Sequence, residues 1–298
     1  MSPVILVATD LTTYSEPALV RAHAHAGAIG GALVVCHVIP DVMRHHPLFA
    51  TRDANDTVLA GDLTKKAAEL VAEQIGRVLR LSVDDYRIVV ETGRAEDEIV
   101  RISEEEHAAL VVIGAKPREG AERVLGHVAE RVVRYAHTSV LIARAHEATA
   151  KILIATDFTD GSTAAMKLGS ELATKLGVDA TLLHVVQLPS ESSALSAVSS
   201  ALGSPWIPPS QNAIESLESL GRNTLEGLAK QYGFTHVEQV TGTPAEVIVA
   251  HAEALGAEMI MMGSRGRTGL ARLVLGSTAE KVIRTSTMSV LVARDGHA

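Results

Sequence analysis

The chain has 298 residues, a formal net charge of −8, and a composition that is 47% hydrophobic but only 3% aromatic. Such a length suits two domains of roughly 150 residues, and an aliphatic core is typical of parallel sheets covered by helices on both faces. The negative charge argues against a nucleic-acid or membrane-surface partner. The single cysteine, Cys36, excludes an intrachain disulfide and indicates a reducing compartment.

The N-terminal sequence MSPVILVATD lacks the charged region and the small-residue cleavage site of a signal peptide. No apolar run in the chain approaches the roughly 20 residues that a membrane-spanning helix needs. We therefore expect a cytoplasmic protein without a membrane partner.

The two halves of the chain carry the same landmarks in the same order. The segment Val4-Ile-Leu-Val-Ala-Thr-Asp10 recurs as Lys151-Ile-Leu-Ile-Ala-Thr-Asp157, and Ser139-Val-Leu-Ile-Ala-Arg144 recurs as Ser289-Val-Leu-Val-Ala-Arg294. Several landmarks with a slowly drifting offset are hard to explain by chance. The repeat predicts two homologous domains, at residues 1–146 and 150–298.

Short β-branched runs alternate with longer helical segments in each half. In the second half we predict strands near 151–156, 180–186, 236–240, 257–263 and 288–293, and helices near 162–177, 211–232, 244–256 and 277–286. This alternation favours right-handed βαβ units. The fold class is therefore α/β, with two tandem doubly wound domains, each a five-stranded parallel sheet with helices on both faces.

The second half contains a glycine motif, G-x2-G-x9-G-S, formed by Gly263, Gly266, Gly276 and Ser277. It follows the apolar run at 257–262. Glycine lets backbone N–H groups approach a ligand closely, and the helix that opens at Ser277 favours an anion at its N-terminus. Two arginines, Arg265 and Arg267, bracket Gly266 and are suited to phosphate oxygens. The pattern predicts a phosphate cradle.

Two residues of the predicted cradle also have simpler interpretations. Asp157 ends a strand and is suited to a turn or a helix cap. The sequence Ser277-Thr-Ala-Glu280 matches a capping box, which satisfies helix N–H groups without a ligand. Neither interpretation explains the spacing of the glycines or the two arginines.

The first half departs from the glycine motif. Pro117 stands where the second glycine is expected, which removes an N–H donor and fixes φ. The stretch from Gly114 to Gly126 is one residue shorter than its counterpart, and His127 replaces Ser277. The pattern therefore predicts an impaired or remodelled phosphate site in this half.

Thirteen histidines raise the question of a metal site. His23 and His25 would point to different sides of a helix. His37 and His184 are repeat equivalents inside strands, where a packing role with a bonded ring nitrogen is expected. A metal site needs ligands that converge at about 2 Å, and we predict none, with His45-His46 as the first place to look.

These motifs together resemble a tandem universal stress protein. The resemblance covers nearly the whole chain and implies bound ATP, with Mg²⁺ as a possible companion. It implies that Asp157 and the strand-end backbones hold the adenine and ribose, and that the glycine motif holds ribose and phosphates. It also suggests that the halves pair through the final strands, 138–143 and 288–293. The implied cofactor-binding residues are Ala155, Thr156, Asp157, Val185, Met262, Gly263, Arg265, Gly266, Gly276, Ser277 and Thr278.

The resemblance implies a regulatory ATP-binding protein of the stress response, with the nucleotide bound mainly in the second half. It would act through nucleotide-dependent conformation or through an unidentified protein partner, and we expect a homodimer. We identify no catalytic residue, so any ATP hydrolysis is expected to be slow. Two alternatives stay open. One is an ATP-hydrolysing or nucleotidyl-transferring enzyme that uses Asp157 and Asp160, and the other is a sensor of a non-nucleotide small ligand.

Overall fold

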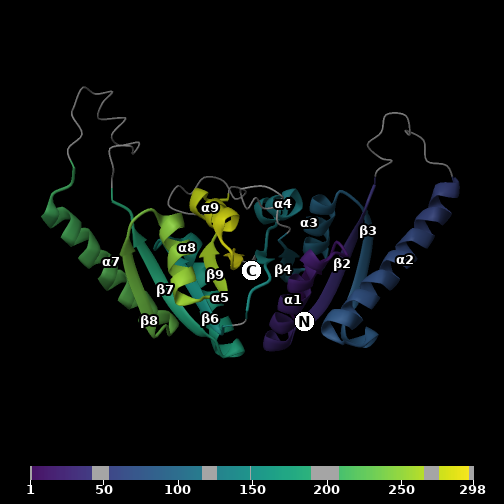
Figure 1. Cartoon of the computed structure of the whole chain (residues 1–298), viewed down its shortest axis with the longest axis horizontal. Helices are drawn as coiled ribbons and strands as arrows, with labels where there is room; N and C mark the ends of the chain where they lie inside the picture. The colour runs from purple at the N-terminus through teal and green to yellow at the C-terminus, as the bar shows by residue number, and fades with distance from the viewer. Residues whose placement is uncertain are drawn as a thin grey trace, which may run out of the picture.

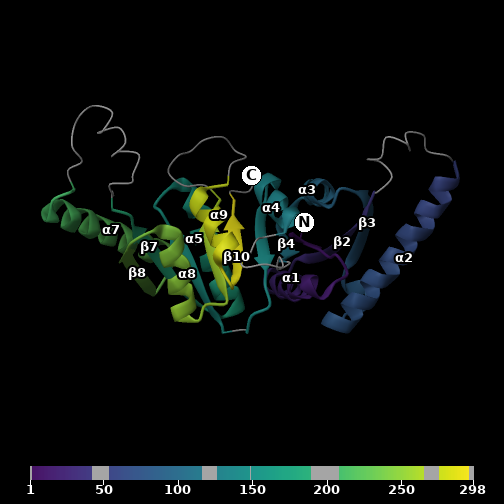
Figure 2. The same cartoon turned by 45° about the horizontal axis from the view of Figure 1, so that its top comes forward.

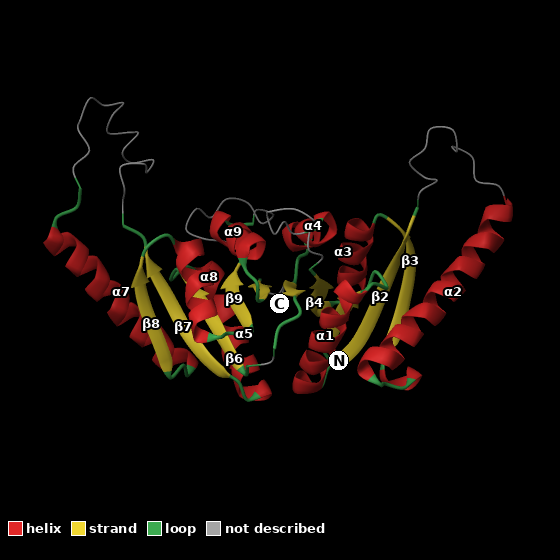
Figure 3. Cartoon of the chain, in the orientation of Figure 1, coloured by secondary structure: helices red, strands yellow, loops and turns green. Residues whose placement is uncertain are grey.

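The computed structural model describes residues 2–41, 54–115, 126–147, 149–188, 208–264 and 275–294. Strands and helices alternate in both halves (Figures 1 and 3). The first half contains β1 (Val4–Ala8), α1 (Glu16–Ile29), β2 (Ala32–Pro40), α2 (Ala54–Leu79), β3 (Arg87–Gly93), α3 (Ala95–Glu105), β4 (Ala108–Gly114), α4 (His127–Tyr135) and β5 (Ser139–Ala143), with short 3-10 turns at Thr13–Ser15 and Val83–Asp85. The second half contains β6 (Lys151–Thr156), α5 (Asp160–Leu176), β7 (Asp179–Val186), α7 (Gln211–Tyr232), β8 (His236–Thr241), α8 (Pro244–Leu255), β9 (Met259–Gly263), α9 (Ser277–Thr285) and β10 (Ser289–Ala293).

Local sequence explains where the helices of the second half begin and end. Pro244 occupies the first turn of α8, where its missing N–H is not needed. Gly256 then ends α8 in the left-handed region, with φ of 66°, and Ala257 donates its N–H back to the carbonyl of Ala252. Because Ala257 belongs to this cap, β9 starts at Met259, slightly later than the sequence predicts.

Each half forms a doubly wound parallel sheet, as predicted. The ten described strands follow the order β3-β2-β1-β4-β5-β10-β9-β6-β7-β8. All neighbouring pairs are parallel except β5 and β10, which pair antiparallel with Leu141 opposite Leu291. The two halves therefore join through their last strands, in agreement with the pairing that the resemblance suggested. In each half the strand order reverses beside the first strand, between β1 and β4 and between β6 and β9.

Two layers of helices cover the joined sheet. Successive strand residues face opposite layers: Ile152 and Ile154 belong to the buried cluster on the side of α1, α2, α5 and α7, whereas Leu153 and Ala155 belong to the cluster on the side of α3, α4, α8 and α9. All four side chains are buried, which is why the strand has an almost continuous apolar sequence. Figures 1 and 2 place α2 and α7 at opposite ends of the molecule and bring α4 and α9 together where the halves meet.

Candidate functional site

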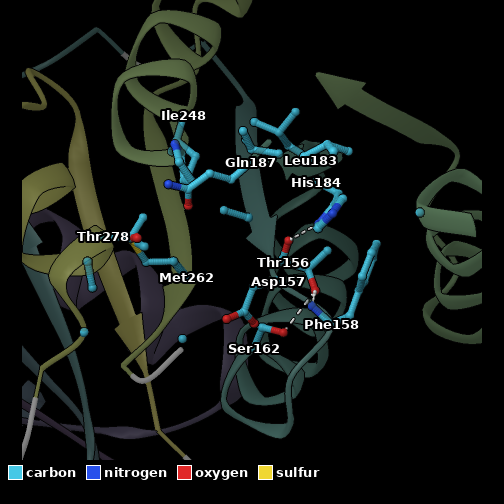
Figure 4. Close-up of a pocket in the computed structure, with 18 of the residues that line it drawn as sticks. Thr156, Asp157, Phe158, Ser162, Leu183, His184, Gln187, Ile248, Met262 and Thr278 are labelled. Atoms are coloured by element: carbon cyan, nitrogen blue, oxygen red, sulfur yellow. Dashed lines mark hydrogen bonds between the residues drawn. The ribbon is translucent and has the colours of Figure 1, made fainter. Parts of the chain in front are cut away.

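A pocket of about 600 Å³ opens at the carboxyl ends of the second-half strands (Figure 4). It lies where the strand order reverses between β6 and β9, which is the usual ligand position in a doubly wound fold. Every predicted site residue that the structure describes lines it. These residues are Ala155, Thr156, Asp157, Val185, Met262, Gly263, Gly276, Ser277 and Thr278. Arg265, Gly266 and the neighbouring Arg267 lie outside the described residues.

The carboxylate of Asp157 organises the loop that follows β6. Its Oδ1 accepts hydrogen bonds from the backbone N–H of Thr159, at 3.1 Å, and from the Thr159 hydroxyl, at 2.6 Å. This turn holds Phe158 in the left-handed region, with φ of 65°. The simpler interpretation of Asp157 as a turn carboxylate is therefore correct for one of its oxygens. The same residue lines the pocket, so a turn role and a ligand role are compatible.

Packing alone explains why residue 263 is a glycine. A Cβ at Gly263 would collide with the backbone carbonyl of Gly161 at the start of α5. The first half shows the same relationship, because a Cβ at Gly114 would collide with the carbonyl of Tyr14. This shared constraint accounts for the glycine that the first half keeps although the rest of its motif differs. Gly263 therefore shapes the wall of the pocket, and its identity alone is not evidence of a ligand.

Gly276 differs from Gly263 in this respect. Its φ of −64° and ψ of 144° are ordinary for any residue, so the backbone does not require glycine there. Its N–H donates to the carbonyl of Ser264 at 2.9 Å, which attaches the start of α9 to the end of β9. Gly276 also lines the pocket. A missing side chain at this point leaves room beside the helix N-terminus, which is the arrangement expected of a phosphate cradle.

The capping-box interpretation of Ser277 is wrong. Ser277 is the first helical residue of α9 rather than its cap, and within the described part of the chain no side chain caps this helix. The Glu280 carboxylate instead lies 3.6 Å from Arg284 and 3.9 Å from Arg134 of the first half. The first intrahelical bond is donated by Glu280 to Gly276, so the N–H groups of residues 277–279 carry no intrahelical bond. They stand at the pocket, where an anion would satisfy them.

An apolar wall on the other side of the pocket was not predicted. The ring of Phe158 stacks on His184 with centroids 3.8 Å apart, and Nδ1 of His184 lies 2.8 Å from the Thr156 carbonyl. This contact confirms the expectation of a packing histidine with a bonded ring nitrogen, which His37 also fulfils through the Thr9 carbonyl. The pocket residues on α7 and α8 were also missed, and they are Leu217, Leu220, Gly221, Thr224, Pro244 and Ile248. Ser162, Leu183, Val186, Gln187 and Ala279 complete the lining.

The corresponding place in the first half is chemically different. Glu96, at the second position of α3, is buried, and the equivalent position of α8 is Ala245. Its carboxylate lies 3.8 Å from Nδ1 of His127, the first residue of α4, and 3.5 Å from Nε of Arg131. The first half thus places a carboxylate and an imidazole beside the N-terminus of α4, which corresponds to the N-terminus of α9 at the pocket of the second half. His127 stands out in the sequence because it replaces Ser277, whereas Glu96 does not, because its approach depends on how α3 and α4 pack.

Within the described ranges, no group of three or more His, Cys, Asp or Glu side chains is placed to hold a metal ion. His45 and His46 fall outside those ranges. The described helices also include none with the length and apolar character needed to cross a membrane.

Fold and site together define a duplicated α/β protein with a pocket at a strand-order reversal. The model of the universal stress protein family matches residues 1–144 and 149–294, so the chain belongs to this family as two tandem copies.

The relatives of the chain agree with this assignment. Universal stress protein MJ0531 of Methanocaldococcus jannaschii is 34% identical over 148 residues, covering 48% of this chain and 81% of that protein. A universal stress protein of Mycolicibacterium smegmatis is 24% identical over 310 residues, covering 97% of this chain and 96% of that protein. The crystal structure of a universal stress protein from Archaeoglobus fulgidus shares the fold, with a TM-score of 0.66 and 23% identity over 99% of both chains.

Proposed function

We propose that the chain is a regulatory protein that binds ATP in its second half. The observation that carries this proposal is the position of Gly276: it lines the pocket at the N-terminus of α9 and has a backbone conformation that does not require glycine. The N–H groups of residues 277–279 supply an anion site at one end. Asp157 and the strand-end backbone of Val185 supply polar groups for a ribose and a base at the other. We place Arg265 and Gly266 near the phosphates by the glycine motif.

The first half is proposed to bind no ATP in the same manner. Phosphate oxygens at the start of α4 would have to compete with the buried Glu96 carboxylate, which already lies beside Arg94, Arg131 and His127. His127 also replaces the hydroxyl that Ser277 offers. The second half would therefore bind the nucleotide, and the first half would serve as its structural partner. The switch between nucleotide-bound and nucleotide-free forms would then be sensed by a further protein.

A matched pair of substitutions tests the proposal. The protein is purified without added nucleotide, denatured, and the released small molecules are identified by mass spectrometry. Binding of Mg-ATP, ADP, AMP and cAMP is then measured by calorimetry. We expect Gly276→Val to abolish ATP binding, because its side chain would fill the space at the helix N-terminus, and Gly126→Val to leave it unchanged. Release of no adenine nucleotide, combined with no calorimetric signal for wild-type protein, would exclude ATP as the ligand.

A second candidate function is favoured by the apolar wall. Phe158, Leu217 and Leu220 would suit an apolar ligand without phosphates, for which the protein would be a sensor. Mass spectrometry of the released material separates the two candidates directly. The enzyme alternative has less support: Asp157 already uses Oδ1 in a turn, and Asp160 is not among the pocket residues. Multiple turnovers of Mg-ATP per second would favour it nevertheless.

We also propose a homodimer and a cytoplasmic location. The single buried cysteine suits a reducing compartment. Because β5 and β10 already pair with each other inside one chain, a second copy must use another surface. Sedimentation velocity at several protein concentrations tests the dimer.

A further inference from the structure

Arg144 of the first half reaches into the second half and holds the far end of α9. Its guanidinium donates through Nη2 to the Ile283 carbonyl at 2.7 Å and through Nη1 to the Met288 carbonyl at 3.1 Å. Its backbone N–H donates to the hydroxyl of Ser289 at 3.1 Å. Carbonyls at the end of a helix lack intrahelical partners, and a cation there interacts favourably with the helix dipole. Arg144 therefore fixes the last turn of α9 and its connection to β10.

The second half returns the same contact to the first. Arg294 donates through Nη2 to the carbonyls of Val133 and Arg134 at the end of α4. Its backbone N–H donates to the hydroxyl of Ser139 at 3.1 Å. The last arginine of each half thus holds the last helix of the other half, and the two contacts form a matched pair.

The two helices differ at their opposite ends. α9 begins at the pocket with Ser277 and Thr278, whereas α4 begins with His127 beside the Glu96 carboxylate. A helix of nine residues is only about 13 Å long at a rise of 1.5 Å per residue. Fixing one end of so short an element also fixes the other end. The Arg144 contact therefore acts on a helix that begins at the pocket, whereas the equivalent Arg294 contact acts on a helix that does not.

A second arginine of the first half acts near the start of α9. Glu280 lies in the first turn of this helix, where its negative charge opposes a bound phosphate. Arg134 of α4 lies 3.9 Å from the Glu280 carboxylate, and Arg284 lies 3.6 Å from it. The first half thereby contributes positive charge close to the proposed phosphate site as well as support for its helix.

We propose that Arg144 is a positioning residue for the nucleotide site of the other half. It holds α9 so that the N–H groups of residues 277–279 face the phosphates, and the first half thus supports a site whose described lining residues all belong to the second half. This inference rests on the nucleotide binding proposed above.

The test compares Arg144→Ala with Arg294→Ala in the full-length protein. Both substitutions remove equivalent contacts between the halves, so their general cost to the structure should be similar. We expect Arg144→Ala to weaken ATP binding roughly tenfold, because the N–H groups of residues 277–279 and the dipole of α9 lose their alignment with the phosphates. We expect Arg294→Ala to change ATP affinity less than about twofold. Adenosine affinity should stay near the wild-type value in both variants, since it does not use the helix N-terminus. Arg144→Lys should recover part of the ATP affinity.

Hydrogen exchange without nucleotide provides a readout that does not depend on binding. Amide exchange in residues 277–285 should rise in Arg144→Ala and not in Arg294→Ala, which should instead affect residues 127–135. Unchanged exchange in α9 of Arg144→Ala, or equal losses of ATP and adenosine affinity, would overturn the positioning role. If wild-type protein binds no nucleotide while exchange in α9 still rises, the proposed function fails and the mechanical role of Arg144 stands.

Discussion

The guanidinium of Arg21 on α1 forms a two-point ion pair with the carboxylate of Glu258, just before β9. Nη1 lies 3.0 Å from Oε1 and Nη2 lies 3.3 Å from Oε2, so the first half is bonded to the second at a buried point. Their side chains are 17% and 6% exposed. Glu258 also accepts a hydrogen bond from the backbone N–H of Thr149 in the connection between the halves.

Removing Arg21 should therefore destabilise the whole molecule. Arg21→Ala leaves the Glu258 carboxylate buried without its cation, for which we expect a loss of about 3 kcal/mol in the free energy of unfolding. Urea denaturation followed by circular dichroism measures it. The control is Lys66→Ala, which breaks the exposed pair with Glu69 and should cost less than about 0.5 kcal/mol. Equal effects of the two substitutions would show that the buried pair has no special role.

His25 should make stability depend on pH. Burial lowers the pKa of its imidazole below the ordinary value of 6.5, and the nearby Arg21 charge lowers it further, against the Arg21 carbonyl and Glu258, which raise it. The unfolded chain therefore binds a proton near pH 6.5 that the folded protein takes up only at lower pH. The stabilising contribution is complete above pH 6.5 and is lost as the pH falls through the lowered pKa, by at most about 1.4 kcal/mol per pH unit.

Thermal or urea unfolding between pH 7.5 and pH 5 measures this dependence. The variant His25→Gln cannot titrate, so its stability should fall less over this range than that of wild type. The control is His37→Gln, which removes a histidine of the same half that is only half-buried, whereas His25 is fully buried. A pH slope unchanged by His25→Gln would contradict the prediction.

Cys36 should be chemically silent in the folded protein. It lies in β2, fully buried, and burial raises the pKa of its thiol to about 12. The reactive thiolate is therefore scarce at neutral pH, and reagents have no access to it. We expect no labelling by iodoacetamide over hours in buffer and complete labelling in urea, measured by mass spectrometry. Rapid labelling under native conditions would show that the sheet opens locally around β2.

Substitutions of three glycines should distinguish effects on stability from effects on ATP binding. Gly263→Ala and Gly114→Ala each place a Cβ against a backbone carbonyl, so both should destabilise by about 2 kcal/mol or more. Gly276→Ala should change stability by less than about 1 kcal/mol, because its backbone angles suit alanine. It should nevertheless weaken ATP binding. Denaturation curves and calorimetry on the same three preparations compare the two effects, and an unchanged ATP affinity in Gly276→Ala would contradict a ligand at this helix.

Much of the architecture could be predicted from the sequence because it depends on local patterns. Apolar β-branched runs specify the strands, and residues such as Pro244 and Gly256 mark the helix ends. The strands that join the halves were suggested by the resemblance to universal stress proteins and not by a local pattern. Gly276 was found through its spacing in the motif.

The missed parts depend on contacts between distant segments. The collision that requires glycine at 263 comes from Gly161, and the stacking of Phe158 on His184 needs β6 and β7 side by side. No local pattern predicts that Glu96 lies beside His127, or that Arg144 bonds to the end of α9. The capping box at Ser277 failed for the same reason. Gly276, bonded to the Ser264 carbonyl, is the cap of α9, and the Glu280 carboxylate lies beside Arg134 of the other half.

The antiparallel join of β5 and β10 has an evolutionary consequence. In an assembly of identical chains, every substitution appears in all copies, so a change that damages a site damages each site at once. Here both partners are encoded in one polypeptide, and the tether keeps their effective concentration high at any dilution. Proline, histidine and a buried glutamate can then accumulate in one copy while its edge strand and Arg144 remain under constraint. Under the proposed division of roles, the join would let one copy change its own pocket and still support its neighbour's.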